Sequence, residues 1–184
     1  MSPVTGTDGI DERGATDLVI IVGNGQIPRN TESMAEATVM LMLACLYDLH
    51  GSEAVLRNDL PQPMPVSARM AKGKLLGLIG FGQIARAIAR RLETWDVRIQ
   101  TYMPRLRSPL PPHVERVELD QLLRTSDIVS VLSPLNDETQ GVLNAERLGM
   151  LKQGAIFINT ARGIIVDEAA LYELVTLPLQ GYHG

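Results

Sequence analysis

The chain has 184 residues, of which 45% are hydrophobic and 21% charged, and its formal net charge is −4. These values are ordinary for a globular protein able to bury a core, and the negative balance argues against a nucleic-acid surface, which needs excess basic residues. A single cysteine, Cys45, excludes an intrachain disulfide and favours a cytoplasmic location, and without an 18-residue apolar run we expect no membrane contact.

The N-terminal part predicts one short strand and one long helix. Leu18 to Val22 is an apolar run followed by a glycine-rich stop, typical of a short buried strand. Ser33 and Glu36 have the spacing of a capping box, which predicts a helix through about Leu49. This helix is apolar nearly all round, so it should be buried, either in the core with Cys45 or in a subunit interface.

A glycine-rich turn follows the next apolar run. Leu75–Ile79 is followed by Gly80-x-Gly82-x-x-Ala85, which passes directly into an amphipathic helix. In the dinucleotide-binding pattern the first glycine permits the turn, and the second keeps side-chain atoms away from a pyrophosphate. The small third residue packs the helix on the strand, and the helix N-terminus attracts phosphate. The alternative is a glycine turn with a purely structural role.

From this turn onward, strand and helix patterns alternate. The predicted strands are near-continuous apolar runs, as expected when helices cover both faces of a parallel sheet. We therefore predict an α/β fold with a doubly wound parallel sheet and right-handed crossovers. The predicted strands are 75–79, 97–102, 128–132 and 155–159, and the predicted helices are 83–94, 119–124, 144–151 and one beginning at Asp167.

Several motifs in series around the glycine turn resemble those of one enzyme family. They are Gly6–Asp11, Asn30–Glu36, Ser126–Ser130, Pro134–Thr139, Ile158–Gly163 and Val166–Leu171. Together they are similar to the D-isomer-specific 2-hydroxyacid dehydrogenases, over about residues 6–174. The resemblance implies a Rossmann-type NAD(P)-binding domain and a second, flavodoxin-like substrate domain built from both chain ends.

The same resemblance predicts the domain organisation. Residues 1–30 would be a remnant of the substrate domain, and residues 31–184 would be the NAD(P)-binding domain, incomplete at its C-terminal end. The segment 175–184 does not continue the family pattern, so we expect the chain to be truncated at both ends. A chain lacking the later βα units would leave a sheet edge unpaired, which predicts low solubility.

Arg162 is the predicted catalytic residue. In the family, the matching arginine holds the carboxylate and carbonyl of a 2-keto acid, a task suited to the two parallel hydrogen bonds of a guanidinium. A surface arginine is the structural alternative. The family also uses a histidine held by a glutamate as acid–base catalyst, which is expected beyond residue 174. We expect His50, His113 and His183 to be structural or exposed, and Asp167 and Glu168 to begin a helix.

The residues after the second strand bear on cofactor choice. NAD-binding sites usually carry an acidic residue about 20 positions after the glycines. Met103 stands there, followed by Arg105 and Arg107, which could pair with a 2′-phosphate. We therefore favour NADP over NAD, the alternative being two arginines that only solvate a loop.

The resemblance assigns further residues to the cofactor. They are Phe81, Gln83 and Ile84 beside Gly80 and Gly82, then Ser133 and Pro134 near the adenine, Thr139 near the phosphates, and Thr160 and Ala161. No metal site is expected.

Two functions from different classes fit these observations. The first is an NAD(P)-dependent oxidoreductase that transfers hydride between the nicotinamide and a 2-keto or 2-hydroxy acid. The second is a catalytically incomplete module that binds a dinucleotide and dimerises, because some relatives act as nucleotide-sensing corepressors. In both, the expected assembly is a homodimer, and the chain alone should bind cofactor better than it turns over.

Overall fold

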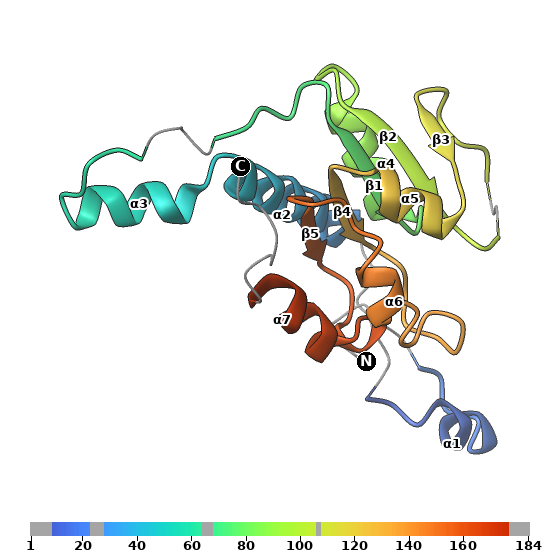
Figure 1. Ribbon diagram of the computed structural model, residues 1–184. Coiled ribbons are helices and arrows are strands. Elements are labelled where there is room, and N and C mark those ends of the chain that lie inside the picture. Colours follow the sequence, from blue (N-terminus) through green and yellow to red (C-terminus); the bar gives the residue numbers. More distant parts are fainter. Residues whose placement is uncertain (1–8, 23–27, 64–67, 106–107, 177–184) are drawn as a thin grey trace.

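The computed structural model describes residues 9–22, 28–63, 68–105 and 108–176. Its centre is a five-stranded sheet in the order β3-β2-β1-β4-β5, and each neighbouring pair is parallel (Figure 1). The strands are β1 (Leu75–Ile79), β2 (Arg98–Tyr102), β3 (Val114–Arg116), β4 (Ile128–Val131) and β5 (Ile156–Asn159). The predicted doubly wound α/β sheet is confirmed, with β3 as an additional strand that the sequence pattern did not predict.

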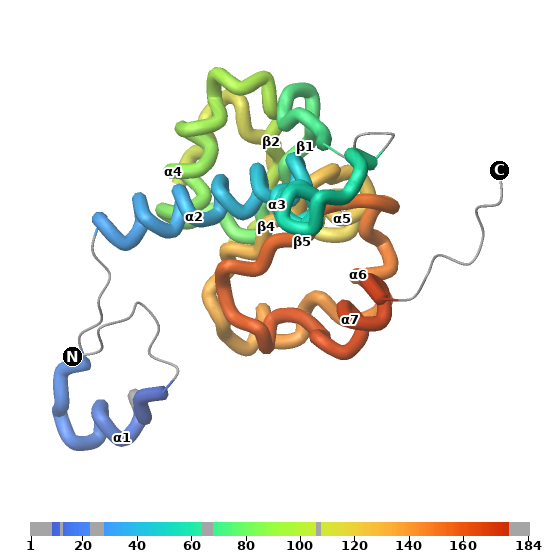
Figure 2. The backbone as a smooth tube through the Cα atoms, turned by 90° about the vertical axis from the view of Figure 1, so that its left-hand side faces the viewer, coloured from blue at the N-terminus to red at the C-terminus, as the bar shows by residue number. Residues whose placement is uncertain are grey.

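Helices cover both faces of this sheet. One face packs against α2 and α4, and the other against α5 and α6 (Figures 1 and 2). The described helices are α1 (Glu12–Asp17), α2 (Pro28–Leu46), α3 (Leu49–Arg57), α4 (Gln83–Leu92), α5 (Leu119–Thr125), α6 (Ala145–Leu148), the 3₁₀ helix η1 (Gly163–Ile165) and α7 (Glu168–Thr176).

The central strands supply apolar side chains to two cores. On β1, Leu76 and Leu78 join the core under α2 and α4, whereas Ile79 joins the core under α5 and α6. Successive side chains of a strand point to opposite faces, so one apolar run serves both layers. Gly77 faces α5, where a Cβ atom would collide with Leu122 and Ser126. The close approach of α5 to β1 therefore requires glycine there.

The N-terminal bound of α2 differs from the prediction. The helix begins at Pro28, five residues before Ser33, so the predicted capping box is wrong. Proline is favourable at a first helical position because it needs no intrahelical N–H partner there. The helix also ends at Leu46 rather than near Leu49, because Asp48 adopts a left-handed conformation (φ 46°) and caps α3.

Only one side of α2 is buried. Met42 and Leu46 are buried, while Met40 and Leu41 are exposed. Cys45 is also exposed, so its predicted core location is wrong. The reason is that α4 and β5 cover one side of the helix and leave the other open. Among the described residues, no single helix is long and apolar enough to cross a membrane, although α2 and α3, bent by 58°, pass that test together.

The segment before α2 does not form the predicted strand. Residues 18–22 are irregular, Val19 has a φ of 55°, and Ile21 is 96% exposed. A buried parallel strand needs neighbouring strands on which to pair, and α1 with its flanking residues lies apart from the sheet in both views (Figures 1 and 2). The predicted boundary at residue 30 falls in the first turn of α2.

Candidate functional site

Four predicted segments come together at the carboxyl ends of the parallel strands. The glycine turn follows β1, the Met103 segment follows β2, the Ser133 segment follows β4, and Arg162 follows β5. Because β1 lies between β2 and β4, the chain reverses its direction of growth across the sheet at β1. Open α/β sheets bind ligands at the carboxyl ends of strands, beside such a reversal. This edge is therefore the candidate site.

Gly80 makes the turn from β1 possible. Its φ is +96°, a conformation that other residues rarely adopt. A Cβ atom there would lie 2.7 Å from Ser133 Oγ and 2.9 Å from the Ser133 nitrogen. The Gly80 N–H donates to the Tyr102 carbonyl at 2.8 Å, which ties the turn to the end of β2. Any side chain at Gly80 would strain the backbone and push the neighbouring loop away.

Gly82 has a different role, because it caps α4 with its backbone extended (φ −83°). A Cβ atom at Gly82 would meet nothing within 4 Å, so the fold itself does not require glycine here. The space in front of it is open, and the first N–H groups of α4 have no partner within the helix. Ala85 is fully buried against the sheet, as the pattern predicted. The turn thus offers an uncovered backbone surface that fits a pyrophosphate.

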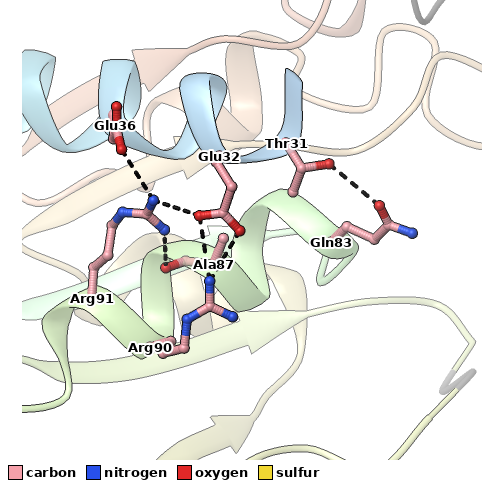
Figure 3. A network of polar contacts seen from close by, with 7 residues as sticks. All are labelled: Thr31, Glu32, Glu36, Gln83, Ala87, Arg90 and Arg91. Atoms are coloured by element: carbon pink, nitrogen blue, oxygen red, sulfur yellow. Dashed lines mark hydrogen bonds and ion pairs between the residues drawn. The ribbon is translucent and has the colours of Figure 1, made fainter. Parts of the chain in front are cut away.

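An ion-pair network joins α4 to α2 (Figure 3). The Glu32 carboxylate of α2 accepts hydrogen bonds from Arg90 at 3.0 Å and from Arg91 at 2.5 Å, and Arg91 also pairs with Glu36 at 3.2 Å. The hydrogen bond from Arg91 is the main cause that lowers the pKa of Glu32. Thr31 donates to the Gln83 side chain at 3.3 Å, so α2 also contacts the first residue of α4.

Arg162 is presented by a compact turn at the end of β5. The Asn159 side chain accepts from the Ala161 N–H at 3.0 Å and donates to the Arg162 carbonyl at 3.1 Å. Thr160 is half-buried, and its hydroxyl lies 3.3 Å from that of Thr38 on α2. The Arg162 residue itself is exposed. Its guanidinium donates to the Ala161 carbonyl at 3.3 Å. The turn therefore fixes the backbone of Arg162 at the carboxyl end of β5.

The loop after β4 closes the other side of the glycine turn. Ser133 is buried and donates to the Ile79 carbonyl at 3.1 Å, while Pro134 is exposed. Thr139 is buried, and its hydroxyl donates to the Pro134 carbonyl at 2.7 Å and accepts from the Asn136 N–H at 2.9 Å. Ser133 therefore lies beside the glycine turn, whereas the Thr139 hydroxyl is engaged in shaping its own loop; the predicted contacts of both residues with the cofactor stay predictions.

The loop after β2 carries a buried residue and an exposed cation. Met103 is only 7% exposed and belongs to the core beside α4, so its side chain packs into the protein interior. Its carbonyl accepts from Arg116 at 3.1 Å. The Arg105 guanidinium pairs with the Glu138 carboxylate of the β4 loop at 2.8 Å. Arg107 lies outside the described residues.

The described histidines lie elsewhere. His50 is exposed on α3, and His113 precedes β3, where it lies 3.7 Å from Glu93. His183 lies outside the described residues. Asp167 caps α7 by accepting from the Ala170 N–H at 3.0 Å, which confirms its predicted place at a helix start. Within the described ranges, no group of three potential ligand residues could hold a metal ion.

A cavity of about 230 Å³ lies at the opposite, amino-terminal edge of the sheet. Asp127 in its wall accepts from the Leu75 N–H at 2.9 Å and from Lys152 at 2.6 Å, and Arg69 donates to the Gly154 carbonyl at 2.9 Å. Partial burial opposes ionisation of Asp127, but the two hydrogen bonds outweigh it and hold its pKa below the ordinary value. These polar groups join separate segments of the fold to one another.

Three residues with positioning roles were not predicted. The sequence placed each of them in a family motif but indicated no individual role; they are Glu32, Glu138 and Asn159. Their partners are distant in sequence or belong to the local backbone: Glu32 pairs with residues 58 and 59 positions away, and Glu138 with one 33 positions away. For Glu32 and Glu138, the available signal was an acidic residue within a motif that could be matched with arginines of another segment; for Asn159, no such signal exists.

Comparisons with known proteins agree with this geometry. Residues 39–177 match the family model described as "D-isomer specific 2-hydroxyacid dehydrogenase, NAD binding domain". A hydroxypyruvate reductase of Thermotoga maritima is 37% identical over 92% of the chain and 55% of its own length. The chain thus spans about half the length of this curated relative.

Two solved structures share the fold. The D-lactate dehydrogenase of Aquifex aeolicus complexed with NAD and lactic acid superposes with a TM-score of 0.85 at 31% identity, over 94% of the chain and 52% of that structure. An acyclic imino acid reductase in complex with NADPH and D-Arg gives 0.84 at 27% identity, over 94% of the chain and 55% of that structure. The predicted NAD-binding Rossmann architecture is confirmed.

Proposed function

The chain belongs to the D-isomer-specific 2-hydroxyacid dehydrogenases, and on that premise we propose that it serves NAD(P)-dependent hydride transfer between the cofactor and a 2-keto or 2-hydroxy acid. The observation that carries the proposal is the placement of Arg162 and the open Gly82 turn at one edge of the sheet. The first element suits an acid substrate, and the second suits a dinucleotide.

The glycine turn and α4 would hold the pyrophosphate. Gly82 presents backbone without a side chain, and the ten-residue helix behind it directs its partial positive charge to the same place. The network of Glu32, Arg90 and Arg91 also joins this helix to α2. The bound nicotinamide supplies or accepts the hydride.

Arg162 would orient the organic acid. A guanidinium is permanently charged and can donate two parallel hydrogen bonds to a carboxylate. Held next to a carbonyl, it also polarises the bond that receives hydride and stabilises the negative charge that develops on oxygen. Because Asn159 fixes the turn on both sides of Ala161, the arginine would be preorganised for this task.

NADP is the proposed preferred cofactor. Met103 stands where an acidic residue would repel a 2′-phosphate, and the guanidinium of Arg105 extends from the same loop with a side chain 76% exposed. The solved relatives support a nicotinamide cofactor in general, one in complex with NAD and the other with NADPH. The preference for NADP depends on the loop residues of this chain alone.

A homodimer through α2 is the proposed assembly. Met40 and Leu41 of α2, and Tyr47 directly after it, expose apolar surface. A second candidate function is dinucleotide binding without turnover, which is supported by the open Gly82 turn at the start of α4, because that turn suits a pyrophosphate without needing an acid–base group.

One experiment separates these candidates. NADPH and NADH are titrated into the protein while energy transfer from its single tryptophan, Trp95, is followed. Oxidation of the bound cofactor is then measured with a panel of 2-keto acids. Binding followed by oxidation supports the dehydrogenase, and binding without oxidation supports the second candidate. Failure of both dinucleotides to bind would overturn both.

A further inference from the structure

One ion pair joins the two loops that flank the glycine turn. The Arg105 Nη2 atom, after β2, lies 2.8 Å from Glu138 Oε1, after β4. Since β1 lies between β2 and β4, this pair connects the two sides of the carboxyl edge above the end of β1. Both side chains remain largely exposed, at 76% and 55%.

The backbone on each side of this ion pair is anchored. The Asn136 side chain accepts from the N–H groups of Glu138 at 2.9 Å and Thr139 at 3.0 Å, which makes a tight turn under Glu138. On the other side, Arg116 donates to the carbonyls of Met103 at 3.1 Å and Pro104 at 3.4 Å. The hydrogen bonds within each loop therefore position Arg105 and Glu138 so that the two side chains can form an ion pair.

We propose that Glu138 limits the preference for NADP over NAD by competing with a 2′-phosphate for Arg105. The inference rests on the proposed dinucleotide site. Met103 is buried and carries no charge, so the β2 loop itself supplies no acidic residue at this position. Glu138 restores a carboxylate there from the other loop, and it neutralises the cation that would attract the phosphate.

Electrostatics predict that Glu138 lowers the affinity of this site for a 2′-phosphate. Binding a 2′-phosphate requires Arg105 to exchange one anionic partner for another while Glu138 stays close and repels the phosphate. An exposed ion pair is weak, so the exchange is feasible, but the repulsion remains. Replacing Glu138 by glutamine removes both the competitor and the repulsive charge. An adenosine ribose without the phosphate gains nothing from that change.

The test compares dissociation constants of NADPH and NADH for the full chain, measured by Trp95 energy transfer. In Glu138→Gln, the ratio of NADPH to NADH affinity should rise about fivefold to tenfold. Asp137→Asn is the matched control, because it removes the same charge from an exposed neighbour in the same loop; its ratio should stay within about twofold of the parent.

Two further measurements complete the test. Arg105→Gln should lower NADPH affinity. In that background, the added Glu138→Gln change should raise the ratio of NADPH to NADH affinity less than it does beside Arg105, because it then relieves only the repulsion. In the unaltered protein, raising the salt concentration should shrink the difference between the two cofactors. An unchanged ratio in Glu138→Gln, or an equal rise in Asp137→Asn, would overturn the proposal while both dinucleotides still bind. If neither binds, the proposed function itself fails.

Discussion

The two edges of the sheet use polar residues in opposite ways. At the amino edge, Asp127, Lys152 and Arg69 bond to segments distant in sequence and hold them together. At the carboxyl edge, Asn136 and Asn159 bond within their own loops and leave nearby cations exposed. Changes at the amino edge should therefore reduce stability, whereas changes at the carboxyl edge should reduce binding and catalysis.

The largest expected effect comes from Arg162. In a protein that turns over a 2-keto acid, Arg162→Gln should lower kcat/KM by about 100-fold or more. The reason is that the guanidinium no longer donates the hydrogen bond that stabilises the negative charge developing on the substrate oxygen. NADPH affinity and melting temperature should stay nearly unchanged, since the residue is exposed. Steady-state kinetics and calorimetry check both parts. A loss of stability comparable to that in an amino-edge variant would erase the contrast between the edges.

Gly80 is the position where binding and stability should fall together. Gly80→Ala forces a φ of +96° on a residue with a Cβ atom and pushes that atom against Ser133. The strain should cost about 1–3 kcal/mol in the free energy of unfolding, and the displaced turn should weaken dinucleotide binding. Urea denaturation with and without NADPH measures both. Unchanged stability would show that the turn is not the strained element described.

Gly82 sharpens the distinction, because its Cβ position is open and its φ is ordinary. Gly82→Ala should cost at most about 1 kcal/mol, the usual penalty for a poor cap, yet weaken dinucleotide binding about tenfold by intruding on the phosphate position. The same denaturation series compares it with Gly80→Ala. An unchanged NADPH affinity in Gly82→Ala would contradict the placement of the pyrophosphate at this turn.

Asp127 tests the amino edge. Asp127→Asn should lower the free energy of unfolding by about 1–2 kcal/mol, because it weakens hydrogen bonds to Lys152 and Leu75, and NADPH affinity should not change. Its folded pKa lies below the ordinary value of 3.8, so the ionised carboxylate stabilises the fold above that pH. The contribution is lost as pH falls through the lowered pKa. Acid unfolding curves of the parent and variant should therefore converge at low pH; a constant gap would contradict this.

The smallest effect is expected at the exposed Glu32 network. Glu32→Gln should slightly lower the melting temperature at low salt, and the difference should fade at high salt. The pKa of Glu32 is lowered by Arg91, so its stabilising contribution is present above the ordinary value of 4.5 and lost in acid. Thermal melts at two salt concentrations measure this. A salt-independent difference would mean that packing, rather than charge, carries the α2–α4 contact.

Periodicity in the sequence was sufficient for most of the sheet. The apolar runs of β1, β4 and β5 supply buried side chains to the cores on the two faces of the sheet. Their predicted bounds agree with those of the observed strands to within a residue. The short strand β3 was missed because only Val114 of its three residues is buried. The prediction of a strand at residues 18–22 was wrong because an apolar run does not form a strand unless a neighbouring strand is available for pairing.

The site was predictable where local chemistry dictates it. Gly80, Gly82 and Arg162 lie in motifs whose spacing alone brings them to strand ends. The Arg105–Glu138 pair and the buried position of Met103 depend on how separate loops meet, and no local pattern records that. The start of α2 lies between these two cases. Proline at position 28 suits the first position of a helix, but Ser33 and Glu36 have the spacing of a capping box and indicated a later start.

Hydrogen exchange with and without saturating NADPH shows whether the dinucleotide binds at the carboxyl edge, because it reports on both edges of the sheet at once. We expect slower exchange at residues 80–86, 133–140 and 159–163, with little change at residues 69–75 and 152–156 of the amino edge. Protection centred on the amino edge, or no protection at the glycine turn despite binding, would contradict this expectation.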